Sequence, residues 1–91
     1  MKKRGAKAVE TKQWSVDIYI NEHGDDTGVR AVLTSSTSTK VEGFGHARRH
    51  PRDRNVPEIG DELAVGRALI DLGARLVRMA DLDMEAVTRQ R

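Results

Sequence analysis

Cysteine is absent from this chain of 91 residues, so neither a disulfide nor a thiolate metal site can stabilise it. No apolar run reaches the length of a signal peptide or of a membrane-spanning helix, even after the basic start at residues 1–5. We therefore expect a cytoplasmic protein with no membrane association. The length corresponds to one domain, near the lower limit at which a core holds together without cross-links.

Aromatic residues are also scarce, and the chain has one of each kind: Trp14, Tyr19 and Phe44. Proteins that bind single-stranded nucleic acids commonly stack the bases on aromatic side chains. Because such a platform is nearly missing, we expect any nucleic-acid binding by this chain to be electrostatic and led by the shape of a duplex.

The net charge of +2 conceals an uneven distribution of charged residues. Positive charge is concentrated in residues 1–12, with a net charge of +4, and in residues 46–54, with a net charge of +3. Residues 13–45 and 55–91 are negative, at −3 and −2. Residues 1–12 have almost no apolar content, which predicts a disordered basic tail.

Three segments alternate apolar and polar residues with the period of a β-strand. They cover residues 14–20, 29–33 and 40–48, and a polar turn at 21–28 and a Ser/Thr-rich connection at 34–39 separate them. In the first two segments the alternation assigns these residues to the core face: Trp14, Val16, Ile18, Ile20, Val29, Ala31 and Leu33. In the third, it assigns to one face Val41, Gly43, Gly45 and Ala47, and to the other Glu42, Phe44, His46 and Arg48.

From Pro57 to about Ala80 the apolar residues recur with the period of a helix. Proline suits the first turn of a helix, where its missing N–H has no intrahelical partner. Three acidic residues near this end favour the positive end of the helix dipole: Glu58, Asp61 and Glu62. Asp81 and Asp83 break the pattern, so we expect residues 81–91 to be a C-terminal extension, either a short helix or disordered.

Two apolar ridges run along this helix. One contains Val65, Leu69, Leu72, Leu76 and Met79, and the other Ile59, Leu63, Ile70 and Val77. Gly66 and Gly73 lie between the ridges, although a glycine inside a helix costs about 1 kcal/mol relative to alanine. Their position indicates a closely packed face, and Gly43 and Gly45 of the third strand are the expected partners. All four glycines are thus predicted packing positions.

These patterns predict an α+β fold. Residues 13–80 are expected to form a single β-β-β-α domain, in which a three-stranded antiparallel β-meander packs against one long C-terminal α-helix. One face of the sheet stays uncovered in this arrangement, and it is either solvated or pairs with another copy of the chain.

No group of residues meets all the requirements of a catalytic or metal site. Residues 43–45 resemble the start of a dinucleotide fingerprint, but the third glycine is missing. His46, His50 and Asp53 have a metal-like spacing, but Pro51 prevents one helix face from presenting them, and the neighbouring arginines repel a cation. We expect no catalysis, no bound metal and no cofactor.

The remaining candidate site is the arginine-rich segment at residues 46–54. Its candidate contacts to a phosphate or a nucleic acid are Arg48, Arg49, Arg52, Arg54, His46 and His50. The other interpretation is a solvated connection in which Arg48 or Arg49 forms salt bridges with acidic residues at the helix start: Glu58, Asp61 or Glu62.

Several short motifs occur together in this part of the chain: Gly45-His46-Ala47-Arg48-Arg49, Pro51 with Asp53, Val56 to Ala64, and Arg67-Ala68-Leu69. This set resembles the signature of a family of small actinobacterial domains of unknown function, over about residues 14–80. Gly66 departs from the alanine associated with that position in the family. The resemblance implies a fold similar to that of a double-stranded-RNA-binding domain, and it implies no catalytic or binding residues.

The function expected from the sequence is that of a non-catalytic accessory domain that binds an unknown protein partner or self-associates. The alternative is an electrostatic nucleic-acid or phosphate binder that uses the Arg48–Arg54 loop and the basic tail. RNA-binding domains of the resembling fold carry a lysine cluster at the start of their final helix, where this chain has acidic residues that repel phosphate. Nucleic acid is therefore the less favoured partner.

Overall fold

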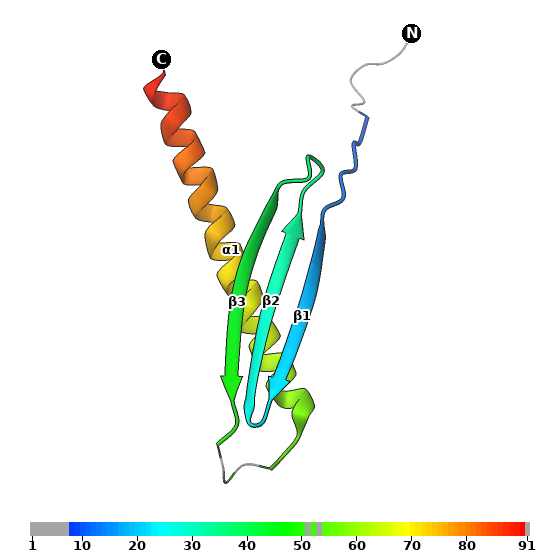
Figure 1. Cartoon of the computed structure of the whole chain (residues 1–91). Coiled ribbons are helices and arrows are strands. Elements are labelled where there is room, and N and C mark those ends of the chain that lie inside the picture. The colour runs from blue at the N-terminus through cyan, green and yellow to red at the C-terminus, as the bar shows by residue number, and fades with distance from the viewer. Residues whose placement is uncertain (1–7, 51, 53, 91) are drawn as a thin grey trace.

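The computed structural model describes residues 8–50, 52 and 54–90. Strands β1 (Ser15–His23), β2 (Asp26–Thr34) and β3 (Lys40–Arg48) form one antiparallel sheet in the order β1-β2-β3. Helix α1 (Pro57–Arg89) lies across one face of this sheet (Figure 1). The α+β fold predicted from the sequence is confirmed. The predicted basic tail falls largely on residues 1–7, which lie outside the described residues, as do Pro51 and Asp53.

The hairpin between β1 and β2 is tighter than the sequence indicates. Pairing continues to His23 opposite Asp26, so the connection is only Gly24 and Asp25 rather than the predicted turn at residues 21–28. Gly24 has a φ of 62°, which the first central position of a type II′ hairpin turn requires. The polar residues on either side were misread as a turn because β1 is an edge strand, where polar side chains face water without cost.

Helix α1 begins at Pro57 as predicted but continues well past Ala80, to Arg89. The prediction that Asp81 and Asp83 end the helix is wrong. Aspartate in a helix interior costs less than about 1 kcal/mol, and neither a glycine nor a proline follows to stop the helix. As a result, the C-terminal part of α1 projects beyond the sheet (Figure 1).

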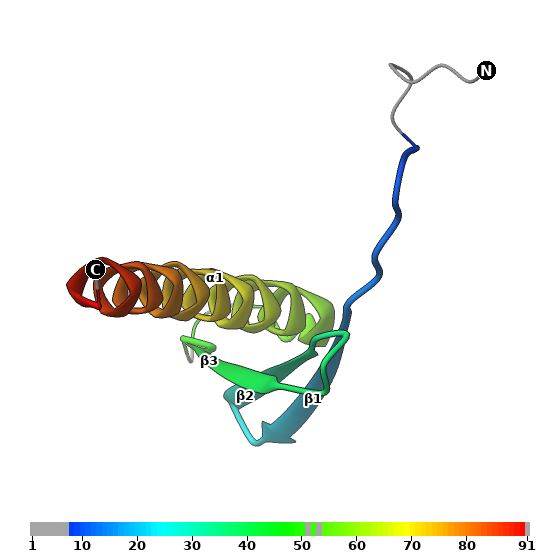
Figure 2. The same cartoon turned by 90° about the horizontal axis from the view of Figure 1, so that it is seen from above.

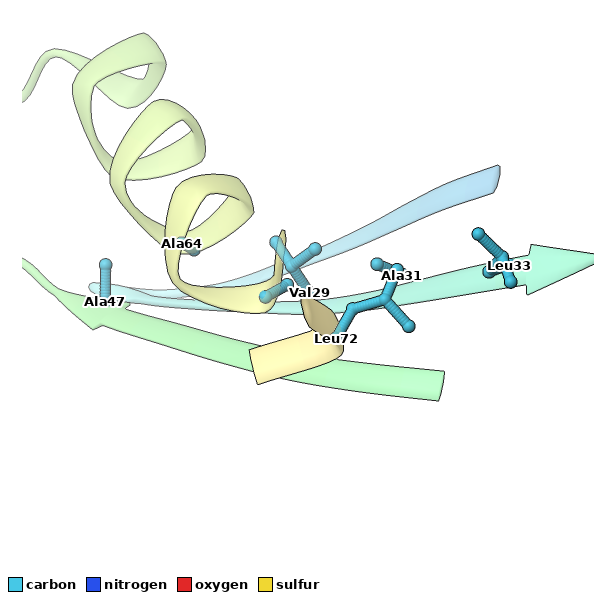
Figure 3. Packing of buried hydrophobic residues seen from close by; sticks show 7 residues of the cluster. Val29, Ala31, Leu33, Ala47, Ala64 and Leu72 are labelled. Atoms are coloured by element: carbon cyan, nitrogen blue, oxygen red, sulfur yellow. The ribbon is translucent and has the colours of Figure 1, made fainter. Parts of the chain in front are cut away.

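The core is small and lies between α1 and the strands β2 and β3. Figure 3 shows its arrangement, and its members are Val29, Ala31, Leu33, Ala47, Ala64, Ala68 and Leu72. Five of these seven side chains are alanine or valine, so the helix and sheet approach closely. Seen from above, α1 covers β3 and β2 and leaves β1 to one side (Figure 2).

Two glycines of β3 allow this close approach. A Cβ atom at Gly43 would lie 2.5 Å from the Leu72 backbone nitrogen and 2.6 Å from the Ala68 carbonyl oxygen. A Cβ at Gly45 would collide with the backbone of Ala64 and Ala68. Because helix backbone atoms cannot yield as side chains do, only glycine fits at these two positions, and α1 is held over β3.

The helix glycines have a different place. The prediction that Gly66 and Gly73 pack against the sheet is wrong, since a Cβ at either position meets no atom within 4 Å. Alanine, not glycine, occupies the sheet-facing positions of α1, at Ala64 and Ala68. The two glycines lie instead with the second predicted ridge, which also faces away from the sheet: Ile59, Leu63, Ile70 and Val77 are all exposed.

The edge of β3 is closed by side chains of α1. The Phe44 backbone N–H donates to Asp71 Oδ2 at 2.8 Å, and Arg67 NH1 donates to the His46 carbonyl oxygen at 2.7 Å. Arg75 also donates to Asp71, at 2.9 Å. The hydrogen bond from the Phe44 N–H is the main cause that lowers the pKa of Asp71, with the nearby arginines adding to it. From the sequence, the position of this polar side opposite the apolar ridges indicated that it faces solvent. In the structure it also contacts the edge of β3.

Strand β1 differs from the prediction most clearly. Val16, Ile18 and Ile20 pair with Leu33, Ala31 and Val29 and so share the helix-facing side of the sheet. They are nevertheless 36–42% exposed, and Trp14 is 51% exposed, because α1 does not extend over β1. These four residues were predicted to be in the core, and the structure shows that they are not.

We predict that Gly45→Ala lowers the melting temperature by several degrees or more, because overpacking against rigid backbone costs at least about 1–3 kcal/mol. Gly28→Ala, on the neighbouring strand β2, is the matched control. Its added methyl group meets open space, and alanine loses less conformational entropy on folding than glycine, so the melting temperature should not fall. Thermal unfolding followed by circular dichroism measures both, and a Gly45→Ala variant as stable as the wild type would contradict the packing described above.

Candidate functional site

The arginine-rich segment follows β3 and lies beside the β1–β2 turn, which determines how its side chains are paired. Arg49 donates from Nε and NH2 to Asp25 Oδ1, at 3.1 and 2.8 Å. Its backbone N–H also donates to the Asp25 carbonyl oxygen at 2.9 Å. The Arg49–Asp25 pair therefore fastens the end of β3 to the hairpin turn, which is a structural use of this guanidinium.

Asp26 gathers two more of the predicted contact residues. His46 Nε2 lies 3.2 Å from Asp26 Oδ1, and Arg48 Nε lies 3.8 Å from the same oxygen. Both contacts are largely solvent-exposed, so each contributes little to stability. The acids that pair with Arg48 and Arg49 thus belong to the β1–β2 turn, and the prediction that they are Glu58, Asp61 or Glu62 of the helix start is wrong.

The other predicted contact residues lie farther along the segment. The Arg52 backbone N–H donates to His50 Nδ1 at 3.1 Å, which shapes the loop locally. Arg54 is exposed and lines a cavity at the start of α1. Three of the six residues predicted as anion contacts, Arg48, Arg49 and Arg54, therefore lie around one cavity, whereas His46, His50 and Arg52 are not among the residues that line it.

A cavity of about 500 Å³ lies between the β1–β2 turn, the arginine-rich segment and the start of α1. Basic residues line it at Arg48, Arg49 and Arg54, acidic residues at Glu22 and Asp25, and apolar residues at Val56, Pro57, Ile59 and Leu63. Because the two signs of charge are mixed along its wall, the cavity does not present the uniform positive potential that selects a phosphate. Sequence reasoning did not foresee it, since its walls come from three separate segments.

Glu22 and Asp61 form a carboxyl pair beside this cavity. Asp61 Oδ1 is buried and has no hydrogen-bond partner among the described residues. Hydrogen bonding to Asp61 and repulsion by its charge raise the pKa of Glu22. The carboxyl group of Asp61 therefore disfavours the charged form of Glu22. No signal in the sequence pointed to this pair, because the two residues are 39 positions apart.

On the outer face of the sheet, away from α1, charged side chains lie over the aromatic rings. Arg30 lies over the Tyr19 ring at 4.5 Å and pairs with Glu42 at 3.3 Å. Arg75 reaches around the β3 edge and lies over the Phe44 ring at 5.5 Å. Since charged groups cover both aromatic rings, this face is mixed in character and is not an apolar contact surface.

An exposed apolar area lies on the other side of the sheet, where α1 leaves most of β1 uncovered. We call this area the β1 surface, and it consists of Trp14, Val16, Ile18, Ile20 and Leu69. Arg67 and Asp71 lie on the flank of α1 that contacts the β3 edge. Leu69 lies on the opposite flank, which faces β1, and therefore belongs to this surface. Alternation in the sequence identified the four β1-side residues, but nothing in the sequence revealed that the helix would not reach them.

Within the part of the chain that the structure describes, no helix combines the length and the apolar character needed to cross a membrane.

Comparison with known proteins identifies chains that are similar to this one. A family model described as Rv2632c-like matches residues 12–91. The uncharacterized protein Mb1767 of Mycobacterium bovis is 52% identical over 87% of this chain and 83% of its own length. The uncharacterized protein Rv2632c of Mycobacterium tuberculosis is 42% identical over 87% of this chain and 84% of its own.

A crystal structure of Rv2632c is also similar to the fold described above. It has a TM-score of 0.83 and 38% sequence identity, and the match covers 93% of this chain and all of that one. The sheet and helix arrangement is therefore shared with a solved relative. The relatives named here are mycobacterial, which agrees with the actinobacterial origin of the family that the sequence motifs resemble.

The carboxyl pair gives a prediction about pH. The raised pKa of Glu22 means that its ionised form is disfavoured in the folded state, so stability is lost as the pH rises through that pKa. Glu22→Gln removes this charge and supplies an amide donor for Asp61 Oδ1. We predict a higher melting temperature than the wild type at pH 7, and a smaller difference as the pH falls below the pKa of Glu22.

Thermal unfolding across pH 4–8 measures this difference. Glu85→Gln, at an exposed position of α1, is the control and should behave like the wild type. Equal melting temperatures for Glu22→Gln and the wild type at pH 7 would show that the two carboxyl groups do not interact.

Proposed function

We propose that this chain, which belongs to the Rv2632c-like family, is a non-catalytic protein-interaction domain that binds an extended segment of another polypeptide along β1. The observation that supports this most strongly is the β1 surface, an apolar row on an edge strand that the protein's own helix does not cover. The relatives named above are uncharacterized, so the argument depends on the geometry of this chain.

The two edge strands of the sheet differ in whether side chains of α1 bond to their backbone groups. At β3 the side chains of Arg67 and Asp71 occupy backbone groups of His46 and Phe44. At β1 no such closure is present among the described residues. β1 also has no proline or lysine, and its pairing with β2 runs through nine consecutive positions without a bulge. Natural proteins usually protect an edge strand by one of these devices, so an unprotected edge of this length favours pairing with another strand.

Main-chain and side-chain contributions would act together at this edge. An added strand forms hydrogen bonds to the outward N–H and C=O groups of β1, which supply affinity without much dependence on sequence. Its alternate side chains then lie beside Val16, Ile18 and Ile20, whose remaining exposure they remove from water. The partner we propose is therefore an extended segment with apolar residues at every second position.

The alternative, a nucleic-acid or phosphate binder, has less support. Asp25 and Asp26 already pair with Arg49, His46 and Arg48. The helix that starts beside these arginines also begins with acidic residues, which repel phosphate. Arg54 lies on the wall of the cavity with Arg48 and Arg49, and residues of the opposite charge, Glu22 and Asp25, line the same wall.

Selection of random peptides on the immobilised wild-type protein tests the proposal. We predict that enriched peptides alternate apolar and polar residues and that, in a titration followed by NMR, they shift the amide signals of β1 more than those of β3. Ile18→Asp should weaken binding at least tenfold, because it places a charge in the middle of the apolar row. Asp17→Asn, on the opposite face of the same strand, is the matched control and should bind normally.

Ile18 contributes little to the core, so the Ile18→Asp variant is expected to remain folded. Its circular dichroism spectrum checks this. Peptides that bind elsewhere, or that bind Ile18→Asp as well as the wild type, would refute the proposed use of β1.

A further inference from the structure

A second apolar surface runs along the side of α1 that faces away from the sheet. Its residues recur at alternating spacings of four and three, which is the heptad pattern of a helix–helix seam. We call this the outer helix stripe: Ile59, Leu63, Gly66, Ile70, Gly73, Val77, Ala80, Met84 and Val87. The large members are exposed, Ile70 most of all at 74%. The sheet-facing row, Ala64, Ala68 and Leu72, is on the opposite side of the helix.

The glycines of the stripe have no use within one copy of the chain. Each costs about 1 kcal/mol relative to alanine in a helix interior. Neither Gly66 nor Gly73 approaches another element, because a Cβ there would have no neighbour within 4 Å. In helix pairs, small residues at regular heptad positions let two backbones come close together. The cost of both glycines is therefore explained if another helix lies against this side of α1.

The overhang of α1 leads to the same conclusion. The helix continues beyond the sheet to Arg89, and residues 80–90 are all exposed (Figure 1). A helical segment of about a dozen residues without packing is marginal in water. Met84 and Val87 continue the outer helix stripe along this overhang, so a helix packed on the stripe would stabilise it.

We propose that the occupant of the outer helix stripe is the α1 helix of a second copy, packed antiparallel. In the middle of this pair each large residue meets a small one. Leu63 faces Ala80 of the second copy, Gly66 faces its Val77, and Ile70 faces its Gly73. At the two ends of the pair, Ile59 faces Met84 of the second copy, outside the region where the glycines bring the two helix backbones close together. Such a self-complementary patch is what a twofold-symmetric dimer requires.

A parallel pair fits the same residues poorly. Leu63 and Ile70 would each face their own equivalents, and Gly66 and Gly73 would do the same, so crowded layers would alternate with empty ones. Such voids are costly in a well-packed interface. The charged residues that flank the stripe do not change this preference for the antiparallel orientation. In the antiparallel pair Arg67 comes near Asp81 of the second copy, which is favourable, whereas Glu62 comes near its Asp83, which is not.

The size of the surface is adequate for a dimer of moderate affinity. The stripe extends over on the order of 40 Å of helix. Six large apolar side chains, each covering roughly 100 Å² when packed, amount to roughly 600 Å² per copy before the flanking residues are counted. A standard interface buries about 800 Å² per partner. We therefore expect a dimer with a dissociation constant in the micromolar range.

This dimer uses a different side of the molecule from the β1 surface, so either proposal can fail without the other. Because the sheet-facing row lies on the opposite side of α1 from the outer helix stripe, the two sheets would lie on the outer sides of the pair, and both β1 edges would remain accessible. A dimer formed in this way would present two such edges.

Cysteine cross-linking tests both the contact and its orientation, because the native chain has no cysteine. Leu63→Cys and Ala80→Cys are prepared separately, mixed under reducing conditions and then oxidised. We expect the mixed disulfide dimer to predominate, since the two positions are neighbours in the antiparallel pair. Leu63→Cys alone should cross-link poorly, because its two copies lie about 25 Å apart along the seam. Efficient cross-linking of each variant with itself would indicate a parallel pair and overturn the proposal.

Sedimentation equilibrium over a range of concentrations provides the second measurement. Wild-type protein is expected to dimerise, and Ile70→Lys is expected to raise the dissociation constant at least tenfold. Leu82→Lys is the matched control, since Leu82 is exposed on the same helix but lies off the stripe, and it should dimerise normally. A monomeric wild-type protein at all concentrations, or equal effects of the two lysine variants, would refute the proposed helix pair.

Discussion

Contact between the backbone of β3 and the backbone of α1, at Gly43 and Gly45, determines how the rest of the molecule is arranged. Because no side chain separates the two elements there, the helix is held over β3 and β2. Helix α1 approaches this far strand of the sheet near Glu22, which pairs with Asp61, but it does not cover the rest of β1. The row of Val16, Ile18 and Ile20 is consequently left exposed, although its alternation is that of a core strand.

The close contact also explains which parts of the fold the sequence could predict. Strand and helix periods revealed three strands and a helix starting at Pro57, because local patterns reflect local geometry. Of the two predicted ridges, the first does meet the sheet, since Leu72 is buried in the core and Val65 and Leu76 pack against it. The periods did not reveal that the second ridge is exposed, or that Ala64 and Ala68 occupy the closest contact, where only a small side chain fits. Large side chains such as Ile70 are therefore excluded from the contact.

The candidate site was predicted less well for a similar reason. The arginines of residues 46–54 were recognisable as a charged cluster, but their partners depend on the short hairpin that brings Asp25 and Asp26 beside the end of β3. That hairpin was predicted to be a longer turn. Because Arg48 and Arg49 pair with Asp26 and Asp25, these charges connect the end of β3 to the hairpin. The β1 surface and the outer helix stripe are apolar, which supports the proposed binding to polypeptides.

The position of α1 over β3 is the central claim, and nuclear Overhauser effects measure it directly. In isotopically labelled protein at low concentration, we predict contacts from the Gly45 Hα protons to the amide and methyl protons of Ala68. The Ile18 and Ile20 methyl groups should show no contact with Ala64 or Ala68. Contacts from Ile18 and Ile20 to these alanines, with none from Gly45, would mean that the helix lies across the middle of the sheet, and would contradict this account.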